Sequence, residues 1–588
     1  MKYFIFVIQL LLVLFFTSFW VYSLNQNFLL CPNKDMLLWD ANIRMIQSID
    51  FLSYLRVGEF FSAVKLILDS PTWPPLRSLI SAILILLNGQ PDPILDTRVS
   101  IVFFFLEILA IFFGTLYFFY EEYKNHILNR ILLFLSIYLS ITFLFLLDQI
   151  PEYLFNSMLE IQGMFFYTFF LFLIYYIYKN NLYSNRLKIL FFITGFLIYF
   201  TKYPYGVLVS FSFFFIELLQ DPKNFLREVH KLIDFYKNYR MVFILLPVLG
   251  IFLIFISPRI SLDLIKTKFI KNFIYITILI SFVELNLFLY KHKIKLFSDS
   301  FRFYYLYFIF PFSVVILSHP DRFHSLLGAQ SDIIDRGRSF FISIFYDYFI
   351  NSYGFSVLVI LSFAWIVYLF ITRKDILKNY PILYVILFLW IHFVILEFLT
   401  TNHQARYIFQ VIPGLILFHT LVFLYMSEKQ KVVVVVLLSL LFLSNVYYIK
   451  INPPSTRKIC FAGYDQTLFE PARIIPKLIP ENTKGIIFNE FHEYKKANIN
   501  LDNPYLLIPT DIDVHIRYKT YKNGFVLNYS KYFNSNQNIQ NFIYITNHCK
   551  NELYQSPFFD LKNLNKNLKT ILVDQIDEFI CLKIYEIE

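Results

Sequence analysis

The stretch MKYFIFVIQLLLVLFFTSFWVY, residues 1 to 22, decides the fold class of this chain. Lys2 is its single charged residue, and its apolar run is longer than the core of a usual signal peptide. No small-x-small cleavage site follows, so we expect an uncleaved membrane anchor. A helix of this length crosses a hydrocarbon core of about 30 Å.

Similar apolar runs recur along the chain. Of its 588 residues, 57% are hydrophobic, 21% are aromatic and 16% are charged, which is too apolar for an ordinary soluble protein. We expect a mainly α, polytopic helical membrane protein with about 13 spans, since each run is close to membrane thickness. The expected spans are residues 3–24, 99–120, 131–147, 163–178, 188–201, 204–219, 242–257, 272–290, 304–318, 355–371, 381–399, 408–426 and 432–447.

The formal net charge of +10 fits this reading. Basic residues gather in alternate loops, such as 124–130, 223–240 and 373–378, whereas the loop around Lys266 is an exception. This bias predicts a cytoplasmic N-terminus. No basic stripe interleaved with aromatics lies on a soluble segment, so we do not expect nucleic-acid binding. The expected location is the bacterial inner membrane, with the endoplasmic reticulum as its eukaryotic equivalent.

Two large segments lie outside the spans, and an odd span number places them on the same, extracytoplasmic side. The first is an outer loop at about 23–98, within a membrane module of 1–449. The second is the tail, 450–588, which is rich in Asn, Lys, Asp and Tyr. We expect two domains divided at this change of composition.

The first outer loop has a helical pattern. Apolar residues recur at helical spacing from Ile43 to Leu55, opposite a polar stripe, which predicts an amphipathic helix in the membrane interface. A second helix is expected over 59–68. The apolar segment Leu76–Leu87 ends at the helix-stop pair Asn88-Gly89 and is too short to span, so we expect an interfacial or re-entrant helix.

The tail alternates short apolar runs with turn-rich linkers, which predicts strands in a small α/β domain. A helix is expected at 467–478. The runs begin at Gly485, Tyr505, Gly524, Asn541, Thr570 and Phe579.

The four cysteines show no CxxC spacing, so neither a zinc site nor a redox motif is expected. We expect free buried thiols. The alternative is a disulfide between two of Cys460, Cys549 and Cys581. The four are Cys31, Cys460, Cys549 and Cys581.

Asp40 stands directly before the expected helix of the first loop. As an N-cap, its carboxylate would accept hydrogen bonds from the first turn. As a general base or metal ligand at the membrane surface, it would act on a substrate. The two roles are compatible, because a capped carboxylate is held rigidly.

The order of several short motifs resembles the GT-C glycosyltransferases, specifically the protein O-mannosyltransferase and lipid A aminoarabinose transferase group (glycosyltransferase family 39). The resemblance covers about residues 1–450, and the tail matches only in general architecture. The motifs are Trp39-Asp40, Trp73-Pro74-Pro75-Leu76, Asn88-Gly89, Thr97-Arg98-Val99-Ser100, GFLIYFTK at Gly195 to Lys202, and Arg406-Tyr407 with Pro413.

The resemblance implies an enzyme that moves a sugar from a polyprenyl-phosphate donor to a lipid, glycan or protein acceptor at the outer face. It implies Asp40 as acceptor base and Glu160 as a supporting carboxylate. Lys202 and Arg406 would bind the donor phosphate, with Arg98 and Arg44 as weaker candidates, because cationic side chains match phosphate. The substrate groove would be lined by Trp39, Trp73, Pro74 and Pro75.

The chain departs from this family at two acidic positions. Asp40-Ala41 stands where members commonly have Asp-Glu, and Glu160 stands where an Asp is usual. Alternatively, Glu160 is an interfacial carboxylate in a solvated loop and has no catalytic role. Asp148 and Glu152 make that loop acidic, so a divalent cation is allowed but not required.

Three other functions stay open. A lipid-linked glycan transporter or flippase would favour charges in mid-span, of which Glu107 and Glu284 are examples. An O-antigen polymerase or ligase would place its large loop late in the chain. A non-catalytic assembly protein would explain the missing Glu at position 41.

Overall fold

The computed structural model describes residues 2–31, 34, 40–56, 58–68, 74–180, 184–220, 222–223, 226–227, 230, 268–292, 299–323, 355–372, 379–399, 408–454, 459, 470–496, 509–521, 525–528, 540–547, 568–576 and 580–587.

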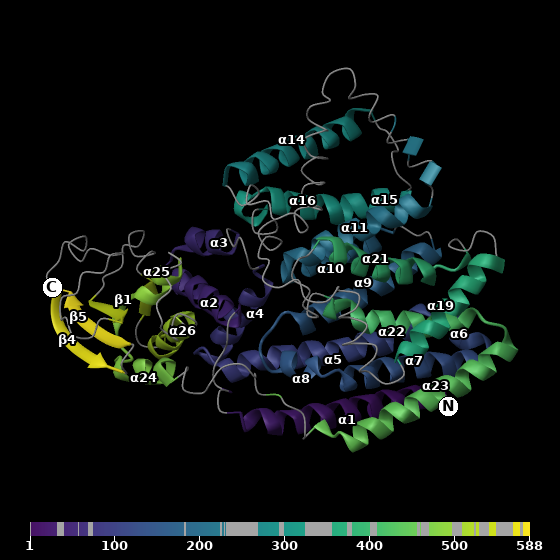
Figure 1. The fold of residues 1–588 in the computed structure, drawn as a ribbon, viewed down its shortest axis with the longest axis horizontal. Coiled ribbons are helices and arrows are strands. Elements are labelled where there is room, and N and C mark those ends of the chain that lie inside the picture. Colours follow the sequence, from purple (N-terminus) through teal and green to yellow (C-terminus); the bar gives the residue numbers. More distant parts are fainter. Residues whose placement is uncertain are drawn as a thin grey trace.

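Most of the described chain is helical (Figure 1). Its apolar part contains α1 (Lys2–Leu29), α5 (Pro93–Phe118), α6 (Tyr120–Asn125), α7 (Ile127–Leu146), α8 (Gln149–Leu154), α9 (Glu160–Asn180), α10 (Asn185–Thr201), α11 (Tyr203–Gln220), α14 (Lys268–His292), α15 (Asp299–Tyr304), η2 (Tyr305–Ile309), α16 (Phe310–Leu317), α19 (Phe355–Thr372), α21 (Ile382–Leu399), η5 (Phe409–Val411), α22 (Ile412–Leu421), η6 (Val422–Tyr425) and α23 (Glu428–Ile451).

The chain is a helical membrane protein. Six of the described helices, α1, α5, α7, α9, α19 and α23, are long and apolar enough to cross a membrane. Shorter apolar segments, of 10 to 17 residues, lie within further helices, among them α11, α14 and α21. Helical segments overlap every expected span except 242–257, which lies outside the described residues.

Local signals in the sequence set several helix starts. The Asp92 carboxylate accepts the Leu95 N–H at 3.1 Å, and Pro93 occupies the first turn of α5. Ser184 caps α10 in the same way through the Leu187 N–H. These side chains satisfy backbone donors that have no partner within the helix.

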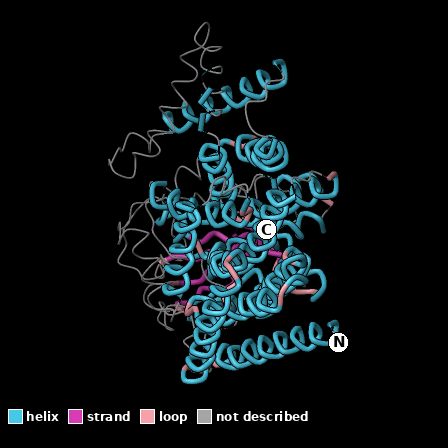
Figure 2. The backbone as a smooth tube through the Cα atoms, turned by 90° about the vertical axis from the view of Figure 1, so that its right-hand side faces the viewer, coloured by secondary structure: helices cyan, strands magenta, loops and turns pink. Residues whose placement is uncertain are grey.

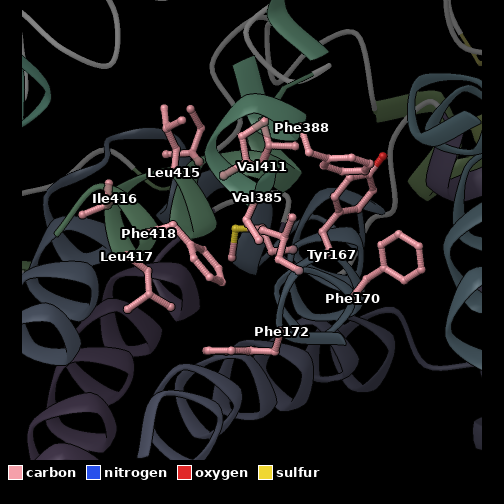
Figure 3. Packing of buried hydrophobic residues seen from close by; sticks show 14 of the residues in the cluster. Tyr167, Phe170, Phe172, Val385, Phe388, Val411, Leu415, Ile416, Leu417 and Phe418 are labelled. Atoms are coloured by element: carbon pink, nitrogen blue, oxygen red, sulfur yellow. The ribbon is translucent and has the colours of Figure 1, made fainter. Parts of the chain in front are cut away.

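Helix α9 lies at the centre of the apolar core. It contacts α5, α10, α21 and α22, and it is the most buried of the six long helices. Figure 3 shows Phe170 and Phe172 of α9 facing Phe388 of α21 and Phe418 of α22. Close packing of this kind fixes the positions of both ends of α9.

The first outer loop forms three helices, α2 (Asp40–Arg56), α3 (Phe60–Leu68) and α4 (Leu76–Asn88). The predicted stop at Asn88-Gly89 is confirmed, because Gly89 has φ 76° and its N–H bonds to the Ile85 carbonyl. Only glycine adopts this left-handed conformation without strain.

The expected amphipathic character of α2 is wrong. Asn42 and Asp50 of its polar stripe are buried, whereas Ile43 and Leu55 are exposed. The physical reason is that α2 contacts α3 and α4 as well as the tail helix α26 (Pro509–Thr520), so protein covers the stripe expected to face water.

The described tail folds around a five-stranded sheet of order β2-β1-β3-β5-β4. Strands β1, β2 and β3 are parallel, and β5 runs antiparallel to both β3 and β4. Five of the six expected strand segments are confirmed, and the run at Tyr505 lies outside the described residues except for Pro509. The elements are α24 (Glu470–Leu478), β1 (Lys484–Asn489), α25 (Glu490–Lys496), α26, β2 (Phe525–Asn528), β3 (Asn541–Thr546), β4 (Leu568–Gln575) and β5 (Cys581–Ile587).

The sheet and the first outer loop occupy the same end of the molecule. Figure 1 shows them at one end of the long axis, while the N-terminus lies toward the other end. Seen along that axis, the strands overlap the outline of the helical bundle (Figure 2).

Helix α26 joins the tail to α2. Arg517 Nη1 lies 2.7 Å from Asp50 Oδ1, and both side chains are buried. Arg56 Nη1 donates to the Tyr521 carbonyl at 3.0 Å, and its guanidinium lies 4.0 Å above the Tyr521 ring. Val514 extends this contact into an apolar cluster with α2 and α4. The two segments expected on one side of the membrane are therefore packed together.

The expectation of free thiols is wrong for the described cysteines. Cys31 and Cys581 are both disulfide-bonded. Cys460 and Cys549 lie outside the described residues. A pattern without CxxC spacing gives no information on such long-range pairing.

Candidate functional site

An ion pair joins the start of α9 to the junction of α10 and α11. Lys202 Nζ lies 3.3 Å from Glu160 Oε1, and the two side chains are 11% and 3% exposed. Lys202 ends α10 in an extended conformation, so α11 begins at Tyr203 in a new direction. The two residues expected from sequence as carboxylate and phosphate partner are thus in direct contact. Glu160 is not in a solvated loop, because it occupies the first turn of α9 and is 2% exposed.

Neighbouring side chains hold this pair in place. The Tyr205 ring centroid lies 5.5 Å from Lys202 Nζ, so the ring's negative face stabilises the ammonium. The same ring packs on Gly163, where a β-carbon would lie 2.6 Å from the ring edge. Gln162 Nε2 donates to Thr201 Oγ1 at 3.1 Å. These contacts lock the start of α9 against the end of α10.

Arg44 approaches the same segment from the first outer loop. Its Nη2 donates to the Ser157 carbonyl at 2.8 Å, and the side chain is 2% exposed. Ser157 has φ 57°, the only positive φ among the described residues other than glycine. Such a conformation is uncommon outside glycine, and a buried cation on its carbonyl helps to hold it. The segment from Ser157 to Glu160 therefore lies between a first-loop arginine and Lys202.

A second buried ion pair supports α4, and sequence reasoning missed it. Arg77 Nη2 lies 2.9 Å from Asp96 Oδ2 and 2.6 Å from the Asp96 carbonyl oxygen. Ser81 Oγ donates to the other carboxylate oxygen. Arg77 belongs to the Pro-Pro-Leu-Arg stretch and Asp96 stands two residues before Arg98, so both were close to recognised motifs.

Helix α4 is also tied to α2. Ser48 Oγ donates to the Ser78 carbonyl at 2.8 Å, and Ser78 Oγ donates to Gln47 Oε1 at 2.6 Å. The pair of Arg77 and Asp96 anchors the other side of α4 to the start of α5. Through these bonds the first outer loop is attached to the membrane helices.

The remaining site candidates differ in where they lie. Arg98 is half-buried and donates to Asn25 Oδ1 of α1, so its guanidinium joins α1 to α5. Pro74 and Pro75 are buried directly before α4, and the Pro75 carbonyl accepts the Leu79 N–H. Helix α2 begins at Asp40.

The Asp40 side chain, Trp39, Trp73 and Arg406 lie outside the described residues. Among the described residues, no group of three or more His, Cys, Asp or Glu side chains has the geometry of a metal site.

The pair of Lys202 and Glu160 could bind two kinds of substrate group. An ammonium paired with a buried carboxylate can exchange that partner for an anionic substrate group, and the carboxylate then offers oxygens to a hydroxyl or a cation. The exchange requires Lys202 to separate from Glu160, while the bond of Gln162 to Thr201 keeps the start of α9 against the end of α10.

No protein-family profile and no curated protein matches this chain.

Proposed function

We propose that this protein is a membrane glycosyltransferase that moves a sugar from a polyprenyl-phosphate donor to a lipid, glycan or protein acceptor. The observation that carries the proposal is the buried contact of Lys202 with Glu160 beside a first-loop arginine, Arg44. A cation and a carboxylate at a helix break, next to an outer loop, are what a lipid phosphate and a sugar hydroxyl require.

The donor phosphate is assigned to the cations. Lys202 would release Glu160 and bind the phosphate, with Arg406, Arg98 and Arg44 as further partners. Lys202 is the best supported of these, because its ammonium points into a defined contact rather than into bulk water. A partly buried cation binds phosphate more strongly than an exposed one, since less water screens the attraction.

The transfer itself is a single displacement. The acceptor oxygen attacks the anomeric carbon, the bond to the phosphate oxygen breaks, and the polyprenyl phosphate leaves with the electron pair. Asp40 takes the acceptor proton, and Glu160, once separated from Lys202, orients a sugar hydroxyl. The anomeric configuration is inverted in this scheme.

The outer face is the proposed location of the reaction. The tail contacts the first outer loop through the buried pair of Asp50 and Arg517, so both lie on one side of the membrane. Disulfides form in oxidising compartments, and Cys31 and Cys581 are bonded in these two segments. The segment 450–588 is then an extracytoplasmic α/β domain and the N-terminus is cytoplasmic, with about 13 spans between them.

The test starts from a strain that lacks the gene. Mass measurement of envelope lipids and glycoproteins should show the loss of one sugar, which wild-type protein restores. Lys202→Met should fail to restore it and Lys202→Arg should restore it in part, because arginine keeps the charge. Lys429→Met is the matched control, since Lys429 is exposed at the start of α23, and it should restore fully.

Asp40→Asn separates the proton transfer from donor binding. It should abolish the added sugar, although α2 still forms, because an amide caps a helix but accepts no proton. Undiminished modification by this variant would refute Asp40 as the base. A full sugar complement in the deletion strain would refute the proposed function itself.

One observation favours a transporter as a second candidate. Glu107 is fully buried in α5 and accepts a hydrogen bond from Thr168 Oγ1 at 2.7 Å, and His392 of α21 lies 2.8 Å from Ser212 Oγ. Buried ionisable groups within spans often mark transport pathways. Transbilayer movement of a labelled polyprenyl-phosphate sugar in vesicles, without product and abolished by Glu107→Gln, would favour this candidate.

A further inference from the structure

The carboxyl ends of β1 and β3 meet at one edge of the tail sheet. β1 pairs in parallel with β2 on one side and with β3 on the other, so the strand order changes direction at β1. In open α/β sheets, ligands bind outside the carboxyl ends of the strands at this switch point.

Polar side chains gather at this edge. Asn489 ends β1, and its Nδ2 donates to Asp513 Oδ1 of α26 at 2.9 Å. His492 of α25 places Nε2 at 2.9 Å from the other oxygen, Asp513 Oδ2. Thr546 ends β3, and its hydroxyl donates to the buried Glu490 carboxylate. These residues come from two strands and two helices, so the fold brings them together.

The hydrogen bonds determine how the imidazole is oriented. The Asp513 side chain is 3% exposed and accepts a hydrogen bond from Asn489. The contact with Asp513 occupies Nε2 of His492, so Nδ1 is the ring nitrogen that is left for a ligand. The His492 side chain is 25% exposed. The same arrangement of carboxylate and imidazole binds and activates hydroxyl groups in many enzymes.

The residue types at this edge indicate which kind of ligand it could bind. The described residues 489–493 and 546–547 include two glutamates, two asparagines, a histidine and a threonine, and none of them is lysine or arginine. Carboxylate, amide and imidazole groups hydrogen-bond well to hydroxyls, and the lysines of α25, Lys495 and Lys496, stand at the other end of that helix.

From this geometry we propose that the carboxyl edge of β1 and β3 is a second binding site, specific for a hydroxyl-rich carbohydrate. His492 Nδ1 forms a hydrogen bond with a ligand hydroxyl, and Asp513 holds the imidazole in position.

One turn of α26 separates Asp513 of this edge from Arg517, which pairs with Asp50 of α2. Helices α2 and α26 run in the same direction, since Asp50 pairs with Arg517 and, further along both helices, Arg56 pairs with Tyr521. Asp513 therefore belongs to a helix that packs against α2, the helix that begins at Asp40. If the proposed transferase function holds, on which this role rests, the bound carbohydrate is the acceptor glycan.

The test uses the full chain, purified in detergent, on a printed array of defined oligosaccharides. At least one oligosaccharide should bind. His492→Gln and Asp513→Asn should each raise its Kd at least tenfold, because one hydrogen bond to an oriented imidazole corresponds to about 1.4 kcal/mol. Lys569→Gln, an exposed position on β4 at the far edge of the sheet, should leave the Kd unchanged.

The outcomes separate this inference from the transferase. Binding of no oligosaccharide, or equal Kd values for wild type and both variants, would overturn the site. If Asp513→Asn does not fold by size-exclusion chromatography, His492→Gln decides alone, because His492 is partly exposed. A wild-type protein that binds carbohydrate but transfers none would refute the transferase and leave the site intact. In an active protein, His492→Gln should raise the KM for acceptor about tenfold, by the same hydrogen bond, and leave the KM for donor unchanged.

Discussion

The buried ion pair between Asp50 of α2 and Arg517 of α26 permits a quantitative test of how the tail is held. Its atoms lie 2.7 Å apart, and each side chain is 3% exposed. At this distance the attraction is about 6 kcal/mol for an effective dielectric constant of roughly 20. Loss of hydration opposes it by several kcal/mol per ion, so the intact pair contributes little net stability.

Removal of one partner lowers stability by much more than the intact pair raises it. Arg517→Met leaves the Asp50 carboxylate buried without its partner, which costs about 3 to 5 kcal/mol. If α26 opens locally, its amides should exchange with deuterium roughly 150- to 5,000-fold faster, since each 1.36 kcal/mol is a factor of ten. Mass spectrometry of peptides from 509–521, on the full chain in nanodiscs, measures this change.

Two further variants serve as comparisons. The double variant Asp50→Leu with Arg517→Met should recover most of the loss, because two apolar side chains can replace a buried pair. Lys519→Met should change exchange little, by about 0.5 kcal/mol or less, since Lys519 bonds to the Lys477 carbonyl at the surface. If the double variant exchanges as fast as Arg517→Met alone, the two residues are not coupled and the reasoning is wrong.

Three other predictions concern different parts of the chain. Gly163→Ala should lower stability by about 1 to 3 kcal/mol, because its β-carbon meets the Tyr205 ring, and thermal unfolding of the purified protein measures this. Maleimide should label Cys31 and Cys581 in the denatured protein only after reduction, and labelling before reduction would contradict their disulfides. Burial raises the pKa of Tyr521 above its ordinary value of 10.0, against an opposing effect of a nearby arginine. The unfolded chain then ionises first as pH rises, so stability should fall above about pH 10, and Tyr521→Phe should reduce this fall in thermal midpoints between pH 9 and 11.

Elements with a strong local pattern could be predicted from the sequence. The run NFIYIT forms β3 at the expected residues, because alternating β-branched and aromatic side chains favour a strand. Gly89 ends α4 because no other residue adopts its conformation without strain. In both cases the deciding interaction lies within a few residues of the chain.

Long-range partners could not be predicted in the same way. Asp50 was read as part of a water-facing stripe, but its partner Arg517 lies 467 residues away. Glu160 and Lys202 were each recognised singly, whereas their contact depends on how α9 packs against α10. A pattern of hydrophobic spacing tells which side is buried only when one neighbour covers one face, and α2 has neighbours on several faces.

Helix α2 therefore couples three parts of the protein. Near its start, Arg44 binds the Ser157 carbonyl just before α9; in its middle, Ser48 bonds to α4 and Asp50 pairs with α26 of the tail. A rigid helix transmits a displacement of one end to the other, so a shift of the tail would move both Asp40 and the segment that carries Glu160. Release of α26 by Arg517→Met should thus disturb the candidate site without any change to its own residues, and this coupling gives the tail a role in positioning Asp40.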